Sequence, residues 1–280
     1  MVIPNRVVIV GGTHGNEWAG IKIVTLYQSY FRNKFPSLKL EFIFANPVAH
    51  ALNSRFKDED LNRAFQYLDE DRPNSYEHSR AKDIKEIIKR EPCLVLDLHT
   101  TTSNMGKTLI VSQYNRQNLS ICEKLTRDLN NCRVIGAPDP HRKYLASQSD
   151  FGLILEVGAV ANSVVGGESL ESTLLLIESI LKLVEGQKIS EKSQVELFEE
   201  MQEVHFPKNE KGEISGYIHP HFQGKDFLPL KGKIIPFKNF EGEEVTLILD
   251  QELFPIFINE AAYYPQQLAF ILCKKKSIFF

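Results

Sequence analysis

RVVIVGGTHGNEWAG, residues 6–20, joins an apolar run to a histidine and a carboxylate through a pair of glycines. Residues 7–10 read as a buried strand, and two adjacent glycines permit a tight turn from strand to helix. His14 and Glu17 follow where this strand ends. Because ligands of α/β proteins commonly bind at the carboxyl edge of the sheet, we predict that both side chains lie at a functional edge.

Short apolar stretches alternate with amphipathic stretches through the first two-thirds of the chain. The predicted strands cover residues 6–10, 39–45, 93–98, 108–111 and 152–157. The predicted helices cover residues 17–32, 75–89, 118–129 and 169–185, where apolar residues recur with a period near 3.6. This alternation is typical of an α/β sheet with helices on both faces.

The character of the sequence changes after Gly186. A polar stretch, QKISEKSQ (residues 187–194), precedes segments that glycine and proline interrupt, and these segments predict short strands joined by turns. We therefore predict two domains: an α/β domain over residues 1–189 and a smaller β-rich domain over residues 190–280.

The composition is that of a globular protein. The chain has 280 residues, 42% of them hydrophobic, and a formal net charge of −3. The longest basic block is the lysine run at residues 274–276, so neither nucleic acid nor a membrane is an expected partner. No apolar run approaches the roughly 20 residues of a membrane span, which predicts a soluble, cytoplasmic protein. The four cysteines lack CxxC spacing, which favours reduced packing residues.

A third candidate ligand lies at the end of another predicted strand. CLVLDLHTTTSNMG, residues 93–106, is apolar up to Asp97 and His99 and then becomes a polar loop. Adjacent parallel strands end at the same edge, so His14, Glu17 and His99 can converge there. Two imidazoles and one carboxylate, with a fourth position open, form a catalytic zinc site. Asp97, on the same face of the strand as His99, can orient its ring.

Each of these residues also has a simpler interpretation when it is taken alone. An HxxE spacing commonly reflects a carboxylate at a helix start beside an unrelated histidine. His99 alone could equally be a hydrogen-bonded residue at a strand end. The metal-site hypothesis therefore depends on the other polar segments of the chain.

The segment NSRFKDEDLNRAF, residues 53–65, is dense in arginine and asparagine. Arginine binds carboxylates through two parallel hydrogen bonds, so Arg55, Asn62 and Arg63 favour a small anionic substrate. The alternative is a surface loop in which the aspartates of the segment pair with its own arginines.

A carboxylate interrupts the apolar strand in FGLILEVGAV, residues 151–160. Glu156 is expected to be buried there, and a buried carboxylate is costly unless it is paired or functional. Desolvation would raise its pKa toward the range of a general base. Structural burial beside a hidden partner is the alternative.

Five segments, in this order, resemble the aspartoacylase branch of the aspartoacylase/succinylglutamate desuccinylase family, relatives of the zinc carboxypeptidases. They are GGTHGNEWAG, SRFKDEDLNRAF, DLHTTTSNMG, ILEVG and INEAAYY. The third and the last resemble aspartoacylases more than desuccinylases. The resemblance implies a zinc-carboxypeptidase-like mixed sheet flanked by helices, with the β-rich C-terminal domain capping the active site. It also implies a hydrolase with one zinc ion per subunit that cleaves N-acetyl-L-aspartate into acetate and L-aspartate.

The same resemblance assigns roles to individual residues. The zinc ligands fall on His14, Glu17 and His99, the set that the strand ends had indicated. The catalytic residues fall on Glu156, which acts as the base, and Arg55, which polarises the scissile carbonyl.

Substrate-binding roles follow from the resemblance in the same way. They fall on Asn62, Arg63, Tyr144 and Tyr263, and Asp60 is expected to position the segment that contains Asn62 and Arg63. The sequence alone favours another interpretation of Tyr263, as an aromatic residue packed inside a β domain.

One stretch departs from the family pattern. Aspartoacylases carry an arginine before the catalytic glutamate that binds the side-chain carboxylate of aspartate. In KYLASQSDFGLILEVG, residues 143–158, that position falls near Gln148. Either Arg142 or a lysine replaces the arginine, or the pocket accepts another amino acid.

Other functions stay open from the sequence. The chain lacks a GxSxG motif, which argues for direct hydrolysis by water rather than through an acyl-enzyme. The alternatives are a deacylase of other N-acyl amino acids, a zinc carboxypeptidase acting on peptides, and a ligand-binding module without activity. A homo-oligomer such as a dimer is also left open.

Overall fold

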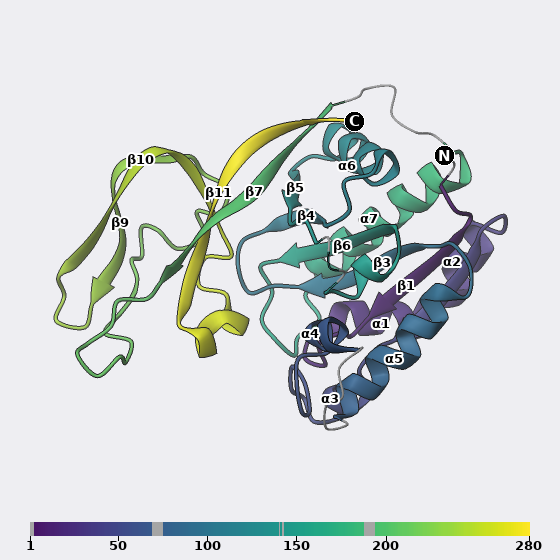
Figure 1. Ribbon diagram of the computed structural model, residues 1–280, viewed down its shortest axis with the longest axis horizontal. Helices are drawn as coiled ribbons and strands as arrows, with labels where there is room; N and C mark the ends of the chain where they lie inside the picture. The colour runs from purple at the N-terminus through teal and green to yellow at the C-terminus, as the bar shows by residue number, and fades with distance from the viewer. Residues whose placement is uncertain (1–2, 69–74, 140, 142, 188–193) are drawn as a thin grey trace.

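A computed structural model describes residues 3–68, 75–139, 141, 143–187 and 194–280, and its strands form one continuous sheet (Figure 1). The order of the strands across this sheet is β2-β1-β3-β6-β4-β5-β7-β11-β10-β9-β8. The strands are β1 (Arg6–Gly11), β2 (Lys39–Phe44), β3 (Leu94–Thr100), β4 (Gly106–Val111), β5 (Cys132–Gly136), β6 (Phe151–Gly158), β7 (Gln194–His205), β8 (Gly216–Ile218), β9 (Leu230–Asn239), β10 (Glu244–Ile256) and β11 (Leu268–Phe279).

Helices cover the first half of the sheet on both faces. The α-helices are α1 (Trp18–Leu26), α2 (Gln28–Lys34), α3 (Pro47–Ala51), α4 (Leu61–Ala64), α5 (Tyr76–Lys89), α6 (Arg116–Asp128) and α7 (Gly167–Glu185). The described residues also form short 3-10 helices: η1 (Phe65–Tyr67), η2 (Ala146–Gln148) and η3 (Ala261–Gln266). No helix among the described residues is long and apolar enough to cross a membrane.

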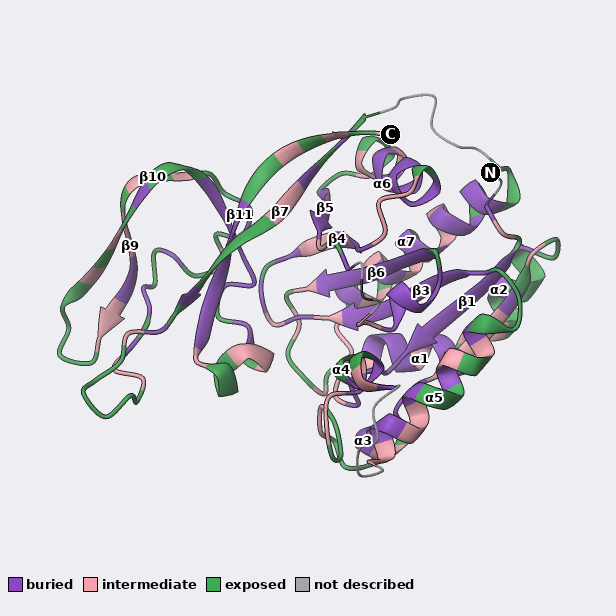
Figure 2. Ribbon diagram, in the orientation of Figure 1, coloured by how far each residue is buried: buried purple, intermediate pink, exposed green. Residues whose placement is uncertain are grey.

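Alternation along the apolar strands explains the two-sided core (Figure 2). Val7 and Ile9 of β1 join a cluster with apolar residues of α1, α2, α6 and α7. Val8 and Val10, which point to the opposite face, join a second cluster with residues of α4 and α5. Strands buried on both faces read as continuous apolar runs, which is why the sequence marks them clearly.

The sheet is mixed. Strand β1 lies parallel to β2 and β3, and β3 lies parallel to β6, whereas β4 runs antiparallel to β6. The register places Val10 beside Asp97 and His99 beside Glu156. The prediction of a mixed α/β sheet flanked by helices is therefore confirmed, and the carboxyl ends of β1, β3 and β6 meet at one edge.

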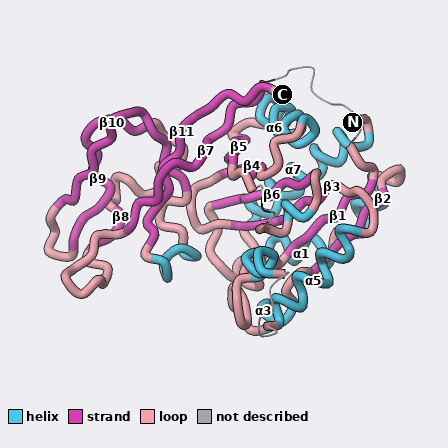
Figure 3. The backbone as a smooth tube through the Cα atoms, in the orientation of Figure 1, coloured by secondary structure: helices cyan, strands magenta, loops and turns pink. Residues whose placement is uncertain are grey.

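The C-terminal strands are longer than the sequence had indicated (Figure 3). Strands β7, β10 and β11 have 12, 13 and 12 residues, so the prediction of short strands is wrong. Glycine and proline lie inside the strands here, because bulges absorb them: Gly232 has a φ of 72° where the pairing of β9 with β10 shifts register. Strand β7 pairs in parallel with β5 at Ile135 and Phe198, which joins the C-terminal strands to the main sheet.

Two further differences concern the first half of the chain. The predicted helix over residues 17–32 is two helices, α1 and α2, which meet at Tyr27. Strand β5, at Cys132–Gly136, was not predicted, because five residues with one charged side chain give a weak strand pattern. All four cysteines are free and buried.

Gly11, the last residue of β1, and Gly12 allow α1 to pack closely on the strand. A Cβ atom at Gly11 would lie 2.2 Å from the carbonyl oxygen of Gly20 in α1. Gly11→Ala should therefore force the helix away and lower the free energy of unfolding by about 1–3 kcal/mol. Gly167→Ala is the matched control, since no atom lies within 4 Å of its Cβ position. Equal urea unfolding curves for the two variants would contradict this close packing.

Candidate metal and substrate site

The loop between β1 and α1 places a histidine and a carboxylate side by side. Gly12, with a φ of 72°, starts the turn in a conformation that suits glycine. The backbone N–H of Glu17 then donates to the carbonyl of His14 at 3.2 Å. The side chains face each other, with His14 Nδ1 2.5 Å from Glu17 Oε1. Both are buried, so the loop presents them inward.

His99, at the end of β3, completes this group. Its Nδ1 atom lies 3.0 Å from Glu17 Oε2, and its ring centroid lies 4.8 Å from that of His14. The potential ligand atoms of His14, Glu17 and His99 all lie within 4.8 Å of one another. Two imidazoles and a carboxylate at this spacing fit the ligand set of a divalent metal such as zinc.

Each imidazole also contacts an outer carboxylate. The Nε2 atom of His99 lies 2.9 Å from Asp97 Oδ2, and that of His14 lies 3.3 Å from Asp60 Oδ1. Both rings therefore direct Nδ1 toward Glu17 and Nε2 away from it. This is the arrangement in which an outer carboxylate fixes the orientation of a metal-binding histidine.

Charges within the group shift its pKa values in opposite directions. Burial alone would raise the pKa of Glu17, but the neighbouring imidazoles His14 and His99 outweigh it and hold that pKa well below its usual range. Burial would lower the pKa of His99, but the carboxylates of Asp97 and Glu17 raise it well above its ordinary value. The imidazoles therefore hold Glu17 in its ionised form, which is the form of a carboxylate that binds a cation.

Glu156 lies on β6, directly beside His99 in the register of the sheet. Its side chain is 8% exposed. Burial raises the pKa of Glu156 to about 8, and the charge of Glu17 adds to the increase while His99 opposes it. A carboxylate with such a pKa accepts a proton more readily than an exposed glutamate.

Asp60 ties the arginine of the next segment to the metal-ligand group. It accepts hydrogen bonds from Arg55 Nε at 3.1 Å and from Arg55 Nη2 at 3.0 Å. Asp60 also caps α4 by accepting from the backbone N–H of Asn62 at 2.9 Å. Arg55 Nη1 lies 3.5 Å from Glu17 Oε1, which brings the guanidinium to the edge of the cluster.

The predicted substrate-binding residues meet across two loops. The guanidinium of Arg63 lies over the ring of Tyr144, 4.9 Å from its centroid. Asn62 Oδ1 accepts a hydrogen bond from the backbone N–H of Leu145 at 2.9 Å. Gln148 is buried and its Nε2 donates to the carbonyl of Tyr144 at 3.0 Å. The suggested substitute Arg142 lies outside the described residues.

A buried carboxylate that sequence reasoning had not singled out, Glu260, holds the C-terminal segment against the loop after β3. Its Oε2 atom accepts from the backbone N–H of Thr102 at 2.8 Å and of Ser103 at 3.3 Å, and from the hydroxyl of Thr101. The sequence signal that could have indicated Glu260 was an acidic residue among the largely apolar residues of INEAAYY, residues 258–264. Because Tyr263 follows three residues later, this contact fixes where Tyr263 lies.

Tyr263 lies within electrostatic reach of Glu156. Burial raises the pKa of Tyr263 above its usual value, and the charges of Glu200 and Glu156 raise it further. Its ring packs edge-on against Phe257, with centroids 5.5 Å apart. The phenol therefore stays protonated and can donate a hydrogen bond near Glu156. Glu200, on β7, is a further charged neighbour that the sequence did not indicate.

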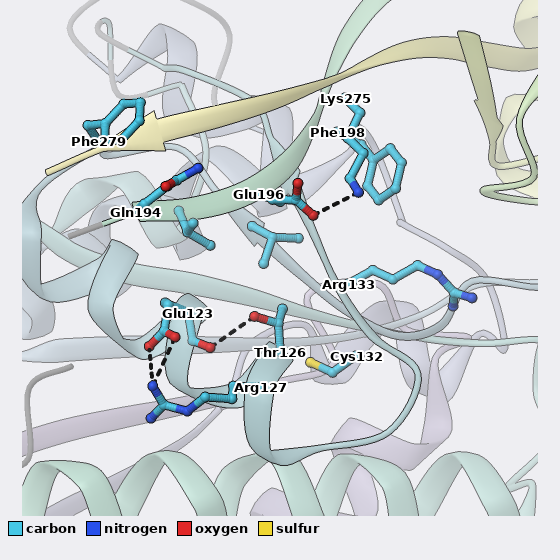
Figure 4. A pocket seen from close by; sticks show the side chains of 12 residues that line it. Glu123, Thr126, Arg127, Cys132, Arg133, Gln194, Glu196, Phe198, Lys275 and Phe279 are labelled. Atoms are coloured by element: carbon cyan, nitrogen blue, oxygen red, sulfur yellow. Dashed lines mark hydrogen bonds and ion pairs between the residues drawn. The ribbon is translucent and has the colours of Figure 1, made fainter. Parts of the chain in front are cut away.

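A separate cavity of about 850 Å³ lies between α6, β5, β7 and β11 (Figure 4). The described side chains that line it include none of the predicted site residues. Its charged side chains are largely paired with each other: Arg127 with Glu123 at 3.0 Å, and Lys275 with Glu196 at 2.7 Å. The predicted chemistry is therefore concentrated at the sheet edge and not in this cavity.

Comparison with known proteins covers almost the whole chain. Residues 4–184 match the succinylglutamate desuccinylase/aspartoacylase catalytic domain, and residues 193–275 match the AstE/AspA barrel-sandwich hybrid domain. A probable aspartoacylase from a Nostoc species is 35% identical, over 98% of this chain and 97% of its own. An N-acyl-aromatic-L-amino acid amidohydrolase (carboxylate-forming) from Xenopus laevis is 32% identical, over 98% and 96%.

The architecture agrees with a solved structure. The crystal structure of murine aminoacylase 3 is similar with a TM-score of 0.91 and 31% identity, covering 98% of this chain and 97% of that chain. The fold is thus that of an α/β catalytic domain followed by a barrel-sandwich hybrid domain. The chain belongs to the succinylglutamate desuccinylase/aspartoacylase family. It is a deacylase of the aspartoacylase and aminoacylase type, which confirms the resemblance read from the five segments.

Proposed function

We propose that the protein is a zinc-dependent amidohydrolase of N-acyl-L-amino acids, with N-acetyl-L-aspartate as its first candidate substrate. The observation that carries this proposal is the meeting of His14, Glu17 and His99, with ligand atoms within 4.8 Å, beside the buried Glu156. Relatives named as a probable aspartoacylase and as an amidohydrolase of N-acyl-aromatic amino acids support the class of reaction.

The three ligands would hold one zinc ion per subunit. When bound, zinc polarises the amide carbonyl and lowers the pKa of a coordinated water to about 7. Glu17 and the two imidazoles together match this ion in donor type, and Asp97 and Asp60 fix the ring orientations.

The remaining steps belong to side chains of the protein. The carboxylate of Glu156 accepts a proton from the water whose oxygen bonds to the amide carbon. Arg55 donates from Nη1, which Asp60 leaves unbound, to the carbonyl oxygen as negative charge develops there. The C–N bond then breaks as Glu156 delivers its proton to the departing nitrogen. The products are a carboxylate and a free amino acid.

Arg63 and Asn62 would bind the α-carboxylate of the substrate. Arg63 has a planar, always charged guanidinium that suits a carboxylate, and the ring of Tyr144 supports it from one side. Asn62 is held through its Oδ1 by the Leu145 backbone, and its amide N–H₂ has no acceptor among the described residues. Tyr263 would close the pocket from the C-terminal domain.

A neutral amino-acid side chain is the second candidate for the substrate, because two observations favour it. The buried amide of Gln148 lies near the position where the resemblance to aspartoacylases places an arginine, and its Nε2 donates to the Tyr144 carbonyl. In addition, the carboxylate of Glu200 interacts electrostatically with Arg63. Desolvation and the charge of Glu203 raise the pKa of Glu200, whereas Arg63 lowers it. A second substrate carboxylate would be repelled by Glu200.

Removing the charge of Glu200 should therefore favour aspartate. In Glu200→Gln, the ratio of kcat/KM for N-acetyl-L-aspartate to that for N-acetyl-L-asparagine should rise about fivefold, which corresponds to about 1 kcal/mol for one solvent-screened charge. Glu210→Gln removes an equal charge from an exposed turn and should leave the ratio unchanged. An unaltered ratio in Glu200→Gln would exclude this residue from substrate selection.

Metal analysis and a substrate panel test the proposed function as a whole. The purified protein should contain about one zinc per chain, lose activity with a chelator and regain it with added zinc. The panel comprises N-acetyl-L-aspartate, N-acetyl-L-asparagine, N-acetyl-L-phenylalanine and a short peptide. Cleavage of the peptide alone would identify a carboxypeptidase, and absence of both zinc and hydrolysis would indicate a binding module.

A further inference from the structure

A buried chain of hydrogen bonds connects the loop after β1 to the histidine on β3. The hydroxyl of Thr13 donates to Asp97 Oδ1 at 2.7 Å, and Asp97 Oδ2 lies 2.9 Å from His99 Nε2. Thr13 and Asp97 are fully buried. The chain therefore runs from one strand end to the other without contact with solvent.

The two hydrogen bonds together fix the orientation of the His99 ring. An ionised carboxylate only accepts hydrogen bonds, so Asp97 Oδ2 accepts from Nε2 of His99. Nδ1 is thereby directed toward Glu17 Oε2, which lies 3.0 Å away. Thr13 occupies the other oxygen of Asp97 and so prevents the carboxylate from rotating away from His99. The ring is thereby held in the orientation that a metal ligand needs.

We propose that Thr13 is a positioning residue of the metal site, which acts through Asp97 on His99. This inference rests on the proposed zinc site. Residues 13–17 then organise all three ligands: His14 and Glu17 directly, and His99 through the hydroxyl of Thr13. The contribution of Thr13 is the hydroxyl alone, because the side chain has no other polar atom to offer.

Two substitutions separate the hydroxyl from the shape of the side chain. Thr13→Val keeps the shape but removes the donor, and should weaken zinc affinity about 10- to 100-fold in competition with a fluorescent chelator. Thr13→Ser keeps the donor and should stay within about threefold of the wild-type affinity. Thr173→Val is the control, since this buried hydroxyl donates to the carbonyl of Ser169 in α7 at 2.8 Å. Wild-type affinity in Thr13→Val would overturn the proposal.

A double substitution tests whether Thr13 acts through Asp97. If it does, Thr13→Val should weaken zinc binding little further in a chain that already carries Asp97→Asn. If the double variant instead lost zinc affinity by the product of the two single losses, Thr13 would not act through Asp97. Should Thr13→Val fail to give the wild-type near-ultraviolet circular dichroism, Thr13→Ala replaces it in both measurements.

The metal-free protein gives a second readout, which keeps this inference distinct from the proposed function. Crystal structures of the metal-free protein should show Asp97 Oδ2 within hydrogen-bond distance of His99 Nε2 in the wild type and in Thr13→Ser, and a rotated Asp97 carboxylate or a displaced His99 ring in Thr13→Val. Unchanged positions of both side chains in Thr13→Val would refute the role of Thr13. A wild-type protein that binds no zinc would refute the proposed function, and the comparison of the metal-free structures would still decide on Thr13.

Discussion

Glu156→Gln should lower kcat for N-acyl amino acid hydrolysis by about 10²- to 10⁴-fold while bound zinc stays at the wild-type level. Glutamine keeps the volume of the side chain but cannot accept the proton of the attacking water. Burial gives Glu156 a pKa of about 8, so the substitution removes an unusually strong carboxylate base. Steady-state kinetics with N-acetyl-L-aspartate or N-acetyl-L-phenylalanine, together with metal analysis by mass spectrometry, measures both quantities.

A second buried glutamate provides the control for this substitution. Glu123 in α6 is also buried, but it pairs with Arg127 beside the separate cavity. Glu123→Gln should therefore keep the wild-type kcat even if it lowers thermal stability. A Glu156→Gln variant with wild-type kcat would assign Glu156 a structural role.

His99→Ala should remove most of the bound zinc and nearly all activity while the protein remains folded. The substitution deletes one of three ligands, and it leaves Glu17 Oε2 and Asp97 Oδ2 without the imidazole that each now contacts. Zinc content after dialysis and residual turnover are the two measurements. Circular dichroism monitors the fold.

His78→Ala is the matched control for the loss of a buried imidazole. His78 lies on α5 and is 2% exposed, but it is not part of the ligand group. This variant should keep its zinc and its activity. If His99→Ala retained stoichiometric zinc, the assignment of His99 as a ligand would be wrong.

The local sequence pattern was enough to predict the sheet and the meeting of the three candidate ligands, His14, Glu17 and His99. Strands buried on both faces are apolar runs in the sequence, and parallel neighbours end at the same edge, so His14 and His99 could be placed together. The length of the C-terminal strands could not be predicted in this way. Gly232 and Pro255 resemble strand breakers, but the partner strands accommodate them through bulges and pairing.

Long-range contacts explain what the sequence left out of the site. Thr13 and Asp97 are 84 residues apart, and Glu260 and Thr102 are 158 residues apart, so no local spacing relates them. The stacking of Arg63 on Tyr144 likewise joins two loops. The resemblance supplied Tyr144 and Tyr263 as site residues, but only the fold gives the contacts that hold them.

The hydrogen bonds that Glu260 accepts from the loop after β3 limit which segments of this protein can be exchanged with those of a relative. A chimera that exchanges the C-terminal residues 190–280 also exchanges Glu260 and Tyr263. It keeps Thr101, Thr102 and Ser103 of the original protein, which donate to Glu260. The graft must therefore carry residues 101–103 of its own parent, or Tyr263 loses its anchor point. The crossover unit for engineering substrate choice is thus a pair of segments far apart in the gene, not one contiguous domain.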